Sequence, residues 1–483
     1  MASERHNVTS DGRRGLTLAA TSLGSALAFI DTTIVVVALP TMAKSLHLGL
    51  QGQQWVYLGY ALSLAALYLV SGALGDRLGL RRAFVVGVVL FALASGLCGL
   101  APNEGVLIAA RLLQGVGGAL LTTNSLALLR VVYADDAGRA IGLWTSFTSL
   151  AAVIGPPAGG AIVEWVSWRW IFVINLPLAA ITVALALAGA GDEEQTAEPR
   201  PIDALGAVLA AVGLAALTYA LVEGGSRGLA DVWPAAVVAA VVLPSFVVRL
   251  VKAKSPLVPP SLFRHRNLAA ANLVSFLIYA ALGGFLLFVP LYLQFLGYSP
   301  FESGLALTPV SLVLAILAPR FSALADRLGP RRFLVGGSAL IGVGIGLLLL
   351  VGTRSAVWSA GVPGLALFSL GLAMFVAPIT ATAIGSAPME LAGVASGVNQ
   401  TVARVGGLVA VAVIGLVVTV VFNRSSVSAG HRPFDPDAVG AALRHASVMG
   451  FRAGMAVAAG LALLGAATAG VWIRDLDKEM GTD

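Results

Sequence analysis

Two charged residues stand deep inside apolar runs, where ionisable side chains are rare and costly. Asp31 lies about 13 Å from the end of its run at Pro40 if that run is helical, and Arg111 lies about 8 Å from the start of another. A buried carboxylate can exchange protons because burial disfavours its charged form. These positions predict a charge pair whose strength depends on protonation of Asp31. A purely structural ion pair, or an Arg111 that extends to the lipid headgroups, are the alternatives.

Three amide side chains, on spans near these two charges, also lie within apolar runs: Gln114, Asn124 and Asn175. In a membrane such groups either line a cavity for substrate or form hydrogen bonds between neighbouring helices. We expect the interhelical bond to be the commoner use of any one of them.

A short charged sequence occurs twice. GALGDRLGLRR, from Gly72 to Arg82, recurs as SALADRLGPRR, from Ser322 to Arg332, which indicates a duplicated unit. Gly79 permits a tight turn. The charged side chains of each copy can form a network between helix ends: Asp76, Arg77, Arg81 and Arg82 in the first, and Asp326, Arg327, Arg331 and Arg332 in the second. Arginines that only fix the topology are the simpler explanation, but they do not account for the repeated aspartate.

A further run combines small residues with proline: Gly155, Pro156, Gly159 and Gly160. Small residues let membrane helices approach closely, and proline permits a helix to bend. We therefore expect this segment to pack against a neighbouring helix.

The elements that must position all these residues are apolar runs of about 20 residues, the length that crosses the hydrocarbon core of a bilayer. The sequence thus predicts an all-α membrane protein. An even number of spans puts both termini on one side, and most Lys and Arg residues fall in the termini and the loops of that side, which the positive-inside rule assigns to the cytoplasm. We count fourteen spans: 15–39, 55–74, 83–101, 105–130, 139–163, 170–190, 203–222, 233–250, 268–295, 303–320, 333–352, 360–384, 394–422 and 448–472.

The two copies of the charged repeat are eight spans apart, whereas two six-helix units would place them six apart. The simplest arrangement inserts two helices between two six-helix bundles, whose parallel duplication suits an alternating-access transporter. Asp203 and Glu223 flank the first inserted span, and we expect a helix cap and an interfacial carboxylate. The predicted parts are a cytoplasmic N-terminus (1–14), an N-terminal bundle (15–190), two inserted helices (203–250), a C-terminal bundle (267–472) and a cytoplasmic tail (473–483).

Composition excludes several classes of protein. Hydrophobic residues make up 58% of the chain and charged residues 11%, well below the ~25% charge of soluble domains. The net charge of +6 follows from basic cytoplasmic loops, so no nucleic-acid partner is expected. The single Cys98, and histidines confined to loops and termini, give no metal site or disulfide. No Lys follows a Gly, so there is no Walker A loop and no direct ATP drive. An enzyme is therefore not expected, while a channel stays an alternative.

GALGDRLGLRR resembles the signature loop after the second helix of the major facilitator superfamily. FIDTTIVVVALP, IAARLLQGVGGALL and GPPAGGAIVEWVSWRWIFVINLP are similar to segments of its fourteen-helix drug:proton antiporter branch, the EmrB/QacA kind, and the resemblance covers essentially the whole chain. The chain departs from the family pattern at three positions. Val36 stands where an Asn is usual, Leu80 where a basic residue is common, and Ala151 where a Gly often stands.

The resemblance implies a major facilitator fold and a proton-coupled antiporter that exports amphipathic drugs or antibiotics by alternating access. It further implies that Arg111 relays protons and that the charged network of the repeated loop locks one of the two access states. The segment from Gly155 to Gly160 is found in exporters of this family and not in importers, so the resemblance also implies export. An endogenous lipid or secondary metabolite is the alternative cargo. The expected partners are a small amphipathic substrate, protons and membrane lipids. We expect a monomer in the bacterial inner membrane that is driven by the proton gradient and needs no cofactor.

Overall fold

The computed structural model is helical and contains no strand in the residues that it describes, which are 2–134, 136–189, 203–253, 258, 260–388, 391–425, 431–435 and 440–475. Within these residues, thirteen helices are long and apolar enough to cross a membrane. The number becomes fourteen if the two halves of a bent helix, Leu50–Tyr68 and Val70–Leu78, are counted as one span. These findings confirm the predicted all-α membrane fold. The C-terminal residues 476–483 of the predicted tail lie outside the described part.

The helices follow one another along the chain with short connections. The first group comprises α1 (Ala2–Leu46), α2 (Leu50–Leu78), α3 (Leu80–Leu100), α4 (Glu104–Val132), α5 (Ala137–Trp165), α6 (Trp170–Val173) and α7 (Asn175–Gly189). Two further helices are α8 (Ala204–Arg227) and α9 (Leu229–Lys252). The last group comprises η1 (Pro260–Arg264), α10 (Arg266–Phe295), α11 (Pro300–Leu328), α12 (Pro330–Leu348), α13 (Arg354–Ala356), η2 (Val357–Gly361), α14 (Val362–Gly385), α15 (Ala392–Asn423) and α16 (Ala441–Trp472).

Several of the predicted spans differ from the observed helices, and three of them show how. Helix α1 runs from Ala2 to Leu46, far beyond 15–39, because backbone hydrogen bonds continue a helix whether or not its side chains are apolar. The span 170–190 is divided into α6 and α7, and Pro177 lies in the first turn of α7, where a missing N–H is tolerated. The last helix begins at Ala441, about two turns before the predicted residue 448.

Polar caps fix where several helices begin. The Asn103 side chain accepts a hydrogen bond of 3.0 Å from the N–H of Val106 at the start of α4. Ser299 and Glu302 form a reciprocal capping box at the start of α11. Such caps satisfy N–H groups that have no partner inside the helix.

Asp203 caps α8, as predicted. Its Oδ1 accepts hydrogen bonds from the N–H of Gly206 at 3.0 Å and from Arg249 Nη2 of α9 at 3.0 Å. Burial opposes the charged carboxylate, but these two donors outweigh it and hold the pKa of Asp203 below its usual value. The carboxylate therefore ties the two inserted helices together at one end.

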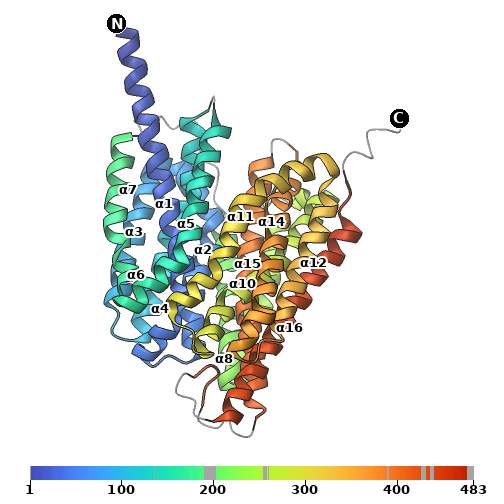
Figure 1. Cartoon of the computed structure of the whole chain (residues 1–483). Helices are drawn as coiled ribbons and strands as arrows, with labels where there is room; N and C mark the ends of the chain where they lie inside the picture. Colours follow the sequence, from blue (N-terminus) through green and yellow to red (C-terminus); the bar gives the residue numbers. More distant parts are fainter. Residues whose placement is uncertain are drawn as a thin grey trace, which may run out of the picture.

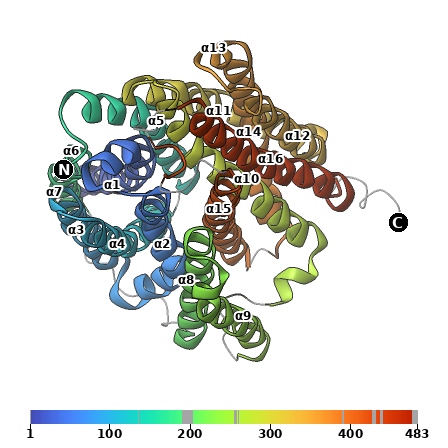
Figure 2. The same cartoon turned by 90° about the horizontal axis from the view of Figure 1, so that it is seen from below.

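The helices form two groups that lie side by side (Figure 1). Helices α1–α7 occupy one side and α10–α16 the other, and both chain termini lie at the same end of the molecule (Figure 1). Helix α8 contacts both α2 and α15, while α9 lies on its outer side (Figure 2). Trp55 of α2 donates a hydrogen bond of 2.9 Å to Glu223 of α8, and Asn423 of α15 donates one of 3.4 Å to the carbonyl of Gly225. One turn of α8 thus bonds to both groups.

Hydrogen bonds between the two groups gather at the end opposite the termini. Gln54 Nε2 donates to the carbonyl of Val411 at 2.9 Å, and Gln294 Nε2 donates to the carbonyl of Val37 at 2.8 Å. The N–H of Phe301 donates to Glu164 at 3.0 Å. These residues lie toward the ends of their helices that are distant from the chain termini. The two groups are therefore closed against each other at that end.

Candidate functional site

A buried cluster of charged and amide groups joins α1 and α4. Arg111 Nη1 donates to Asp31 Oδ2 at 2.6 Å, and the two side chains are 0% and 1% exposed. Gln114 completes the cluster, because its Oε1 accepts from Arg111 Nη1 at 2.7 Å and its Nε2 donates to Asp31 Oδ1 at 2.8 Å. The predicted contact between Asp31 and Arg111 is confirmed, while its dependence on protonation stays a prediction. The alternative in which Arg111 extends to the headgroups is wrong in this structure, since its guanidinium is fully buried.

Local structure explains how this cluster is built. Residues three apart lie on one face of a helix, so α4 presents Arg111 and Gln114 together toward α1. Arg111 Nε also donates to the carbonyl of Val56 on α2 at 3.0 Å. The ring of Tyr60 lies 4.6 Å from the guanidinium carbon. Three helices of one group therefore hold a single arginine.

Proton binding would change the charge of this cluster. The pair is neutral overall when Asp31 is ionised, and protonation would leave Arg111 as an uncompensated buried cation. The other described acceptors of Arg111, Gln114 Oε1 and the carbonyl of Val56, are neutral, and its Nη2 makes no hydrogen bond to any described residue, so none of them replaces the lost negative charge. Binding of a proton to Asp31 would therefore change the stability of the packing of α1 against α4.

The two asparagines bond helices together and do not line a cavity. Asn124 Nδ2 of α4 donates to the carbonyl of Ser71 on α2 at 3.3 Å. Asn175 Nδ2 of α7 donates to Ser95 Oγ on α3 at 3.0 Å. Both residues are at most 1% exposed. The structure thus bears out the interhelical bond and corrects the cavity-lining option for these two and for Gln114, because all their side chains are buried between helices.

A cavity of about 420 Å³ lies between the two groups of helices. Tyr60 and Thr32 belong to its wall, so it is separated from the Asp31–Arg111 pair by one layer of side chains. Most of its lining is aromatic or aliphatic, and Arg404 of α15 is the one charged residue among the described residues that line it. The aromatic members are Phe29, Tyr57, Tyr60, Tyr68, Trp144 and Tyr279.

The aromatic residues and Arg404 that line this cavity were not predicted from the sequence. An arginine within an apolar run was itself a signal, because intramembrane charges mark functional sites. Tyr57, Tyr60 and Tyr68 recur at spacings of 3 and 8 residues, which keeps them near one face of α2. Neither pattern shows which helices face each other across the cavity, so the pocket itself was not deducible.

The repeated charged loop has the same backbone in both copies. Gly79 has φ of +87° between α2 and α3, and Gly329 has φ of +86° between α11 and α12. Both values lie in the left-handed region that favours glycine. Asp76 is exposed and forms no ion pair with any described residue. The charged side chains of the first copy lie at the surface, with Arg77 and Arg82 exposed and Arg81 half-buried.

The second copy of the loop is bound by the last turn of α16 and by the segment that follows it. The N–H of Arg331 donates to Asp475 at 3.1 Å, and its guanidinium donates to the carbonyl of Gly470. Its other charged residues, Asp326, Arg327 and Arg332, are exposed. The two copies are thus alike in backbone but differ in their partners.

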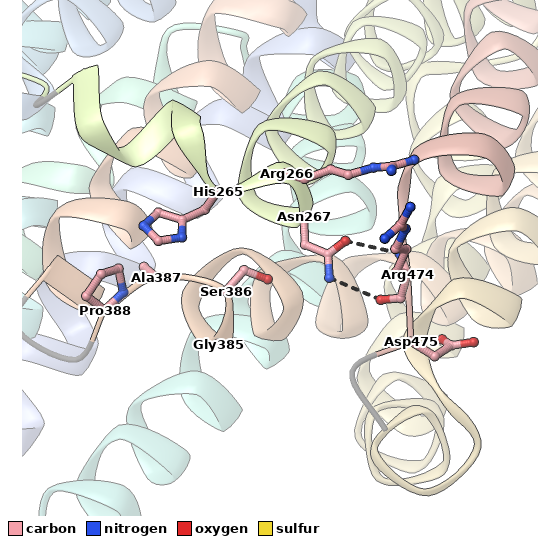
Figure 3. A pocket seen from close by; sticks show the side chains of 9 residues that line it. All are labelled: His265, Arg266, Asn267, Gly385, Ser386, Ala387, Pro388, Arg474 and Asp475. Atoms are coloured by element: carbon pink, nitrogen blue, oxygen red, sulfur yellow. Dashed lines mark hydrogen bonds between the residues drawn. The ribbon is translucent and has the colours of Figure 1, made fainter. Parts of the chain in front are cut away.

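A second cavity, of about 440 Å³, lies beside this segment at the end that carries the termini. Figure 3 shows the side chains that line it, which come from the start of α10, the end of α14 and the residues after α16. Asn267 holds the backbone of Arg474 on both sides, donating to its carbonyl at 3.1 Å and accepting from its N–H at 3.0 Å (Figure 3). These bonds anchor the end of the last helix, far from the Asp31 cluster in sequence and in fold.

The glycines of α5 lie in close helix contacts, as predicted. Gly155 lies against Thr33 and Gly159 against Ile34, both of α1. Gly160 lies against the backbone of Pro300 and Phe301 at the start of α11. In return, Gly304 of α11 lies against the carbonyl of Pro156. Small residues thus allow α5 to contact one helix from each group.

Comparisons with known proteins agree with this architecture. Residues 21–411 match the family described as Major Facilitator Superfamily. The chain is 36% identical over 411 residues to Multidrug resistance protein Stp of Mycobacterium tuberculosis, which covers 83% of this chain and 75% of that protein. It is 34% identical over 413 residues to the tetracenomycin C resistance and export protein of Streptomyces glaucescens, covering 84% and 76%. It is 33% identical over 476 residues to the puromycin resistance protein pur8 of Streptomyces alboniger, covering 96% and 92%.

Solved structures show the same fold at low sequence identity. A bacterial homologue of the human lysosomal transporter Spinster, in an inward-facing and unoccupied conformation, matches with a TM-score of 0.68 at 17% identity over 95% of this chain and 96% of that one. The POT family transporter PepTSo matches with a TM-score of 0.66 at 15% identity over 96% of this chain and 99% of that one.

Proposed function

Because this chain belongs to the Major Facilitator Superfamily, whose members are transporters and not enzymes, we propose that it exports amphipathic drugs or antibiotics from the cytoplasm in exchange for protons. One observation carries the proposal. A fully buried Asp31–Arg111 pair lies one side-chain layer behind the wall of a cavity between two groups of helices. A titratable acid next to a substrate-sized cavity is what coupling of cargo to protons requires.

Alternating access accounts for the asymmetry of the contacts. The two groups are joined by hydrogen bonds at the end opposite the termini. The positive-inside rule supports termini in the cytoplasm of a bacterial cell. With that orientation, the structure is the state in which the outer face is closed and cargo enters from inside. Asp76 is exposed and forms no ion pair with any described residue, which fits a loop network that engages this carboxylate in the opposite state.

Protonation supplies the driving force in this scheme. In the inward state Asp31 is ionised and paired, and cargo binds in the cavity. In the outward state cargo leaves and Asp31 takes a proton from outside, so Arg111 loses its counter-charge and the packing of α1 on α4 is weakened. On return to the inward state the proton passes to the cytoplasm and the ion pair forms again. A gradient of one pH unit is worth about 1.4 kcal/mol per proton, and 100 mV adds about 2.3 kcal/mol per charge moved.

The name of one relative favours a second cargo class. A protein 34% identical to this chain is described as a resistance and export protein for tetracenomycin C. Export of a secondary metabolite made by the same cell would use the same cavity and the same coupling. The two cargo classes differ only in where the compound comes from.

Purified protein in liposomes tests the proposal directly. An imposed proton gradient should drive a fluorescent amphipathic dye against its own concentration gradient. Collapse of the gradient with a protonophore should stop net movement at equal concentrations. Uphill export that continues after the collapse would contradict proton coupling. Current across the membrane in unitary steps would indicate a channel.

A further inference from the structure

The wall of the central cavity combines six aromatic side chains with one cationic group. Thr32, Thr122 and Gln400 add neutral hydrogen-bonding groups, and none of the described residues in the wall is acidic. Aromatic rings bind flat apolar compounds by stacking. The chemistry of the wall is therefore aromatic and electropositive.

Arg404 has no hydrogen-bond or ion-pair partner among the described residues, and its Nε is buried without an acceptor. Its guanidinium carbon lies 4.9 Å from the centre of the Tyr68 ring. A guanidinium has five N–H donors in a planar fork and stays charged at every accessible pH. Arg404 thus offers both charge and donors to a molecule that enters the cavity.

No acid among the described residues that line the cavity neutralises this charge. Asp31 is the acid of the neighbouring layer, and it is already bonded to Arg111 at 2.6 Å and to Gln114 at 2.8 Å. That pair contributes no net charge when it is ionised. The field inside the cavity is therefore set by Arg404, which attracts anions and repels cations.

We infer that the cavity takes flat aromatic compounds that carry an acidic group, with Arg404 binding the acid while the tyrosines and Trp144 stack on the rings, and that it disfavours lipophilic cations. Aromatic rings alone would attract cations, but a fixed positive charge in the same wall opposes them. A carboxylate or ionised phenol matches the guanidinium fork and fills its unused donors. This inference rests on the proposed export function and names its substrate class.

Two dyes with the same xanthene ring system and opposite charge provide the test. Carboxyfluorescein is anionic and rhodamine 123 is cationic. We expect proteoliposomes with an imposed pH gradient to export carboxyfluorescein at least tenfold faster than rhodamine 123. In Arg404→Gln, export of the anion should fall at least tenfold while export of the cation stays the same or rises.

Two further variants separate recognition from folding. Arg404→Lys keeps the charge but loses the planar fork, so it should retain part of the preference for the anion. Arg452→Gln on α16 removes another arginine whose buried Nε has no acceptor in the described residues but which does not line the cavity, and it should leave the preference unchanged.

Fluorescence polarisation in detergent measures binding without any gradient. Carboxyfluorescein should bind wild type at least tenfold more tightly than Arg404→Gln. Equal binding by both proteins, or wild type that prefers the cation, would overturn the inference. Binding that depends on Arg404 without any gradient-driven transport would instead contradict the proposed export mechanism and leave the substrate class standing.

Discussion

Replacing Asp31 by Asn isolates the charge of the buried pair, because the two side chains have nearly the same size. Arg111 is 0% exposed and would lose the carboxylate that lies 2.6 Å from it. Removing one partner of a buried ion pair costs about 3–5 kcal/mol, because the other charge is left without compensation. We therefore expect Asp31→Asn to lower the thermal stability of the detergent-solubilised protein clearly.

The same substitution should abolish proton coupling. With one proton exchanged per molecule of cargo, a gradient of one pH unit supports about a tenfold accumulation in wild type, since 1.4 kcal/mol corresponds to a factor of ten. Asp31→Asn has no group to titrate, so its dye should only equilibrate across the liposome membrane. Asp31→Glu, which keeps an acid, should retain a measurable gradient-driven accumulation.

A double variant distinguishes coupling from a structural role. Asp31→Asn with Arg111→Gln leaves no charge in this cluster, so its stability should return toward that of wild type while accumulation stays absent. If accumulation recovered together with stability, the pair would be structural only. A single Asp31→Asn variant that still builds a tenfold gradient would refute the assignment outright.

Three further substitutions test other parts of the structure. Gly304→Val should separate α5 from α11, because Gly304 lies against the carbonyl of Pro156. The separation should open the cavity toward the outside, so labelling from outside of a cysteine placed in the cavity wall by Thr122→Cys should increase at least twofold. Unchanged labelling would argue against closure by this contact. Asp76→Asn should slow transport at least tenfold with dye affinity kept within twofold, and a changed affinity at normal rate would contradict a lock in the opposite state. Asp203→Ala should cost about 1 kcal/mol of stability as a lost cap. Its carboxyl has a lowered pKa, so this difference in thermal unfolding should be full above the unfolded value of about 3.9 and disappear as the pH falls through the lower folded value; a pH-independent difference would contradict the ionised cap.

The sequence was sufficient to predict most of the spans, the Asp31–Arg111 pair and the glycine turn at Gly79. Each of these features depends on local rules. An apolar run of membrane length forms a helix whatever its neighbours are, a lone buried charge needs a partner, and a left-handed turn favours a glycine such as Gly79. Arg111 was predictable as the partner of Asp31 because few charged residues lie inside the apolar runs, whereas the place of Gln114 in the cluster was not predicted.

The cavity was not predictable for a physical reason. In a soluble helix the apolar face points inward, but in a membrane helix lipid-facing and core-facing residues are both apolar, so periodicity no longer identifies the buried face. The wall draws on Tyr57 of α2, Trp144 of α5, Tyr279 of α10 and Arg404 of α15, which come together only in the folded protein. The attachment of Asp475 to the second loop likewise joins residues that are 144 positions apart.

The turn of α8 that contains Glu223 and Gly225 has a consequence for the transport cycle. It is bonded to Trp55 in one half of the protein and to Asn423 in the other. A swing that parts the two halves on the outer face cannot keep both bonds at their present lengths. In the proposed alternating-access cycle, breaking one of these bonds would add to the barrier between the two states, so α8 would influence the speed of turnover without touching the cargo.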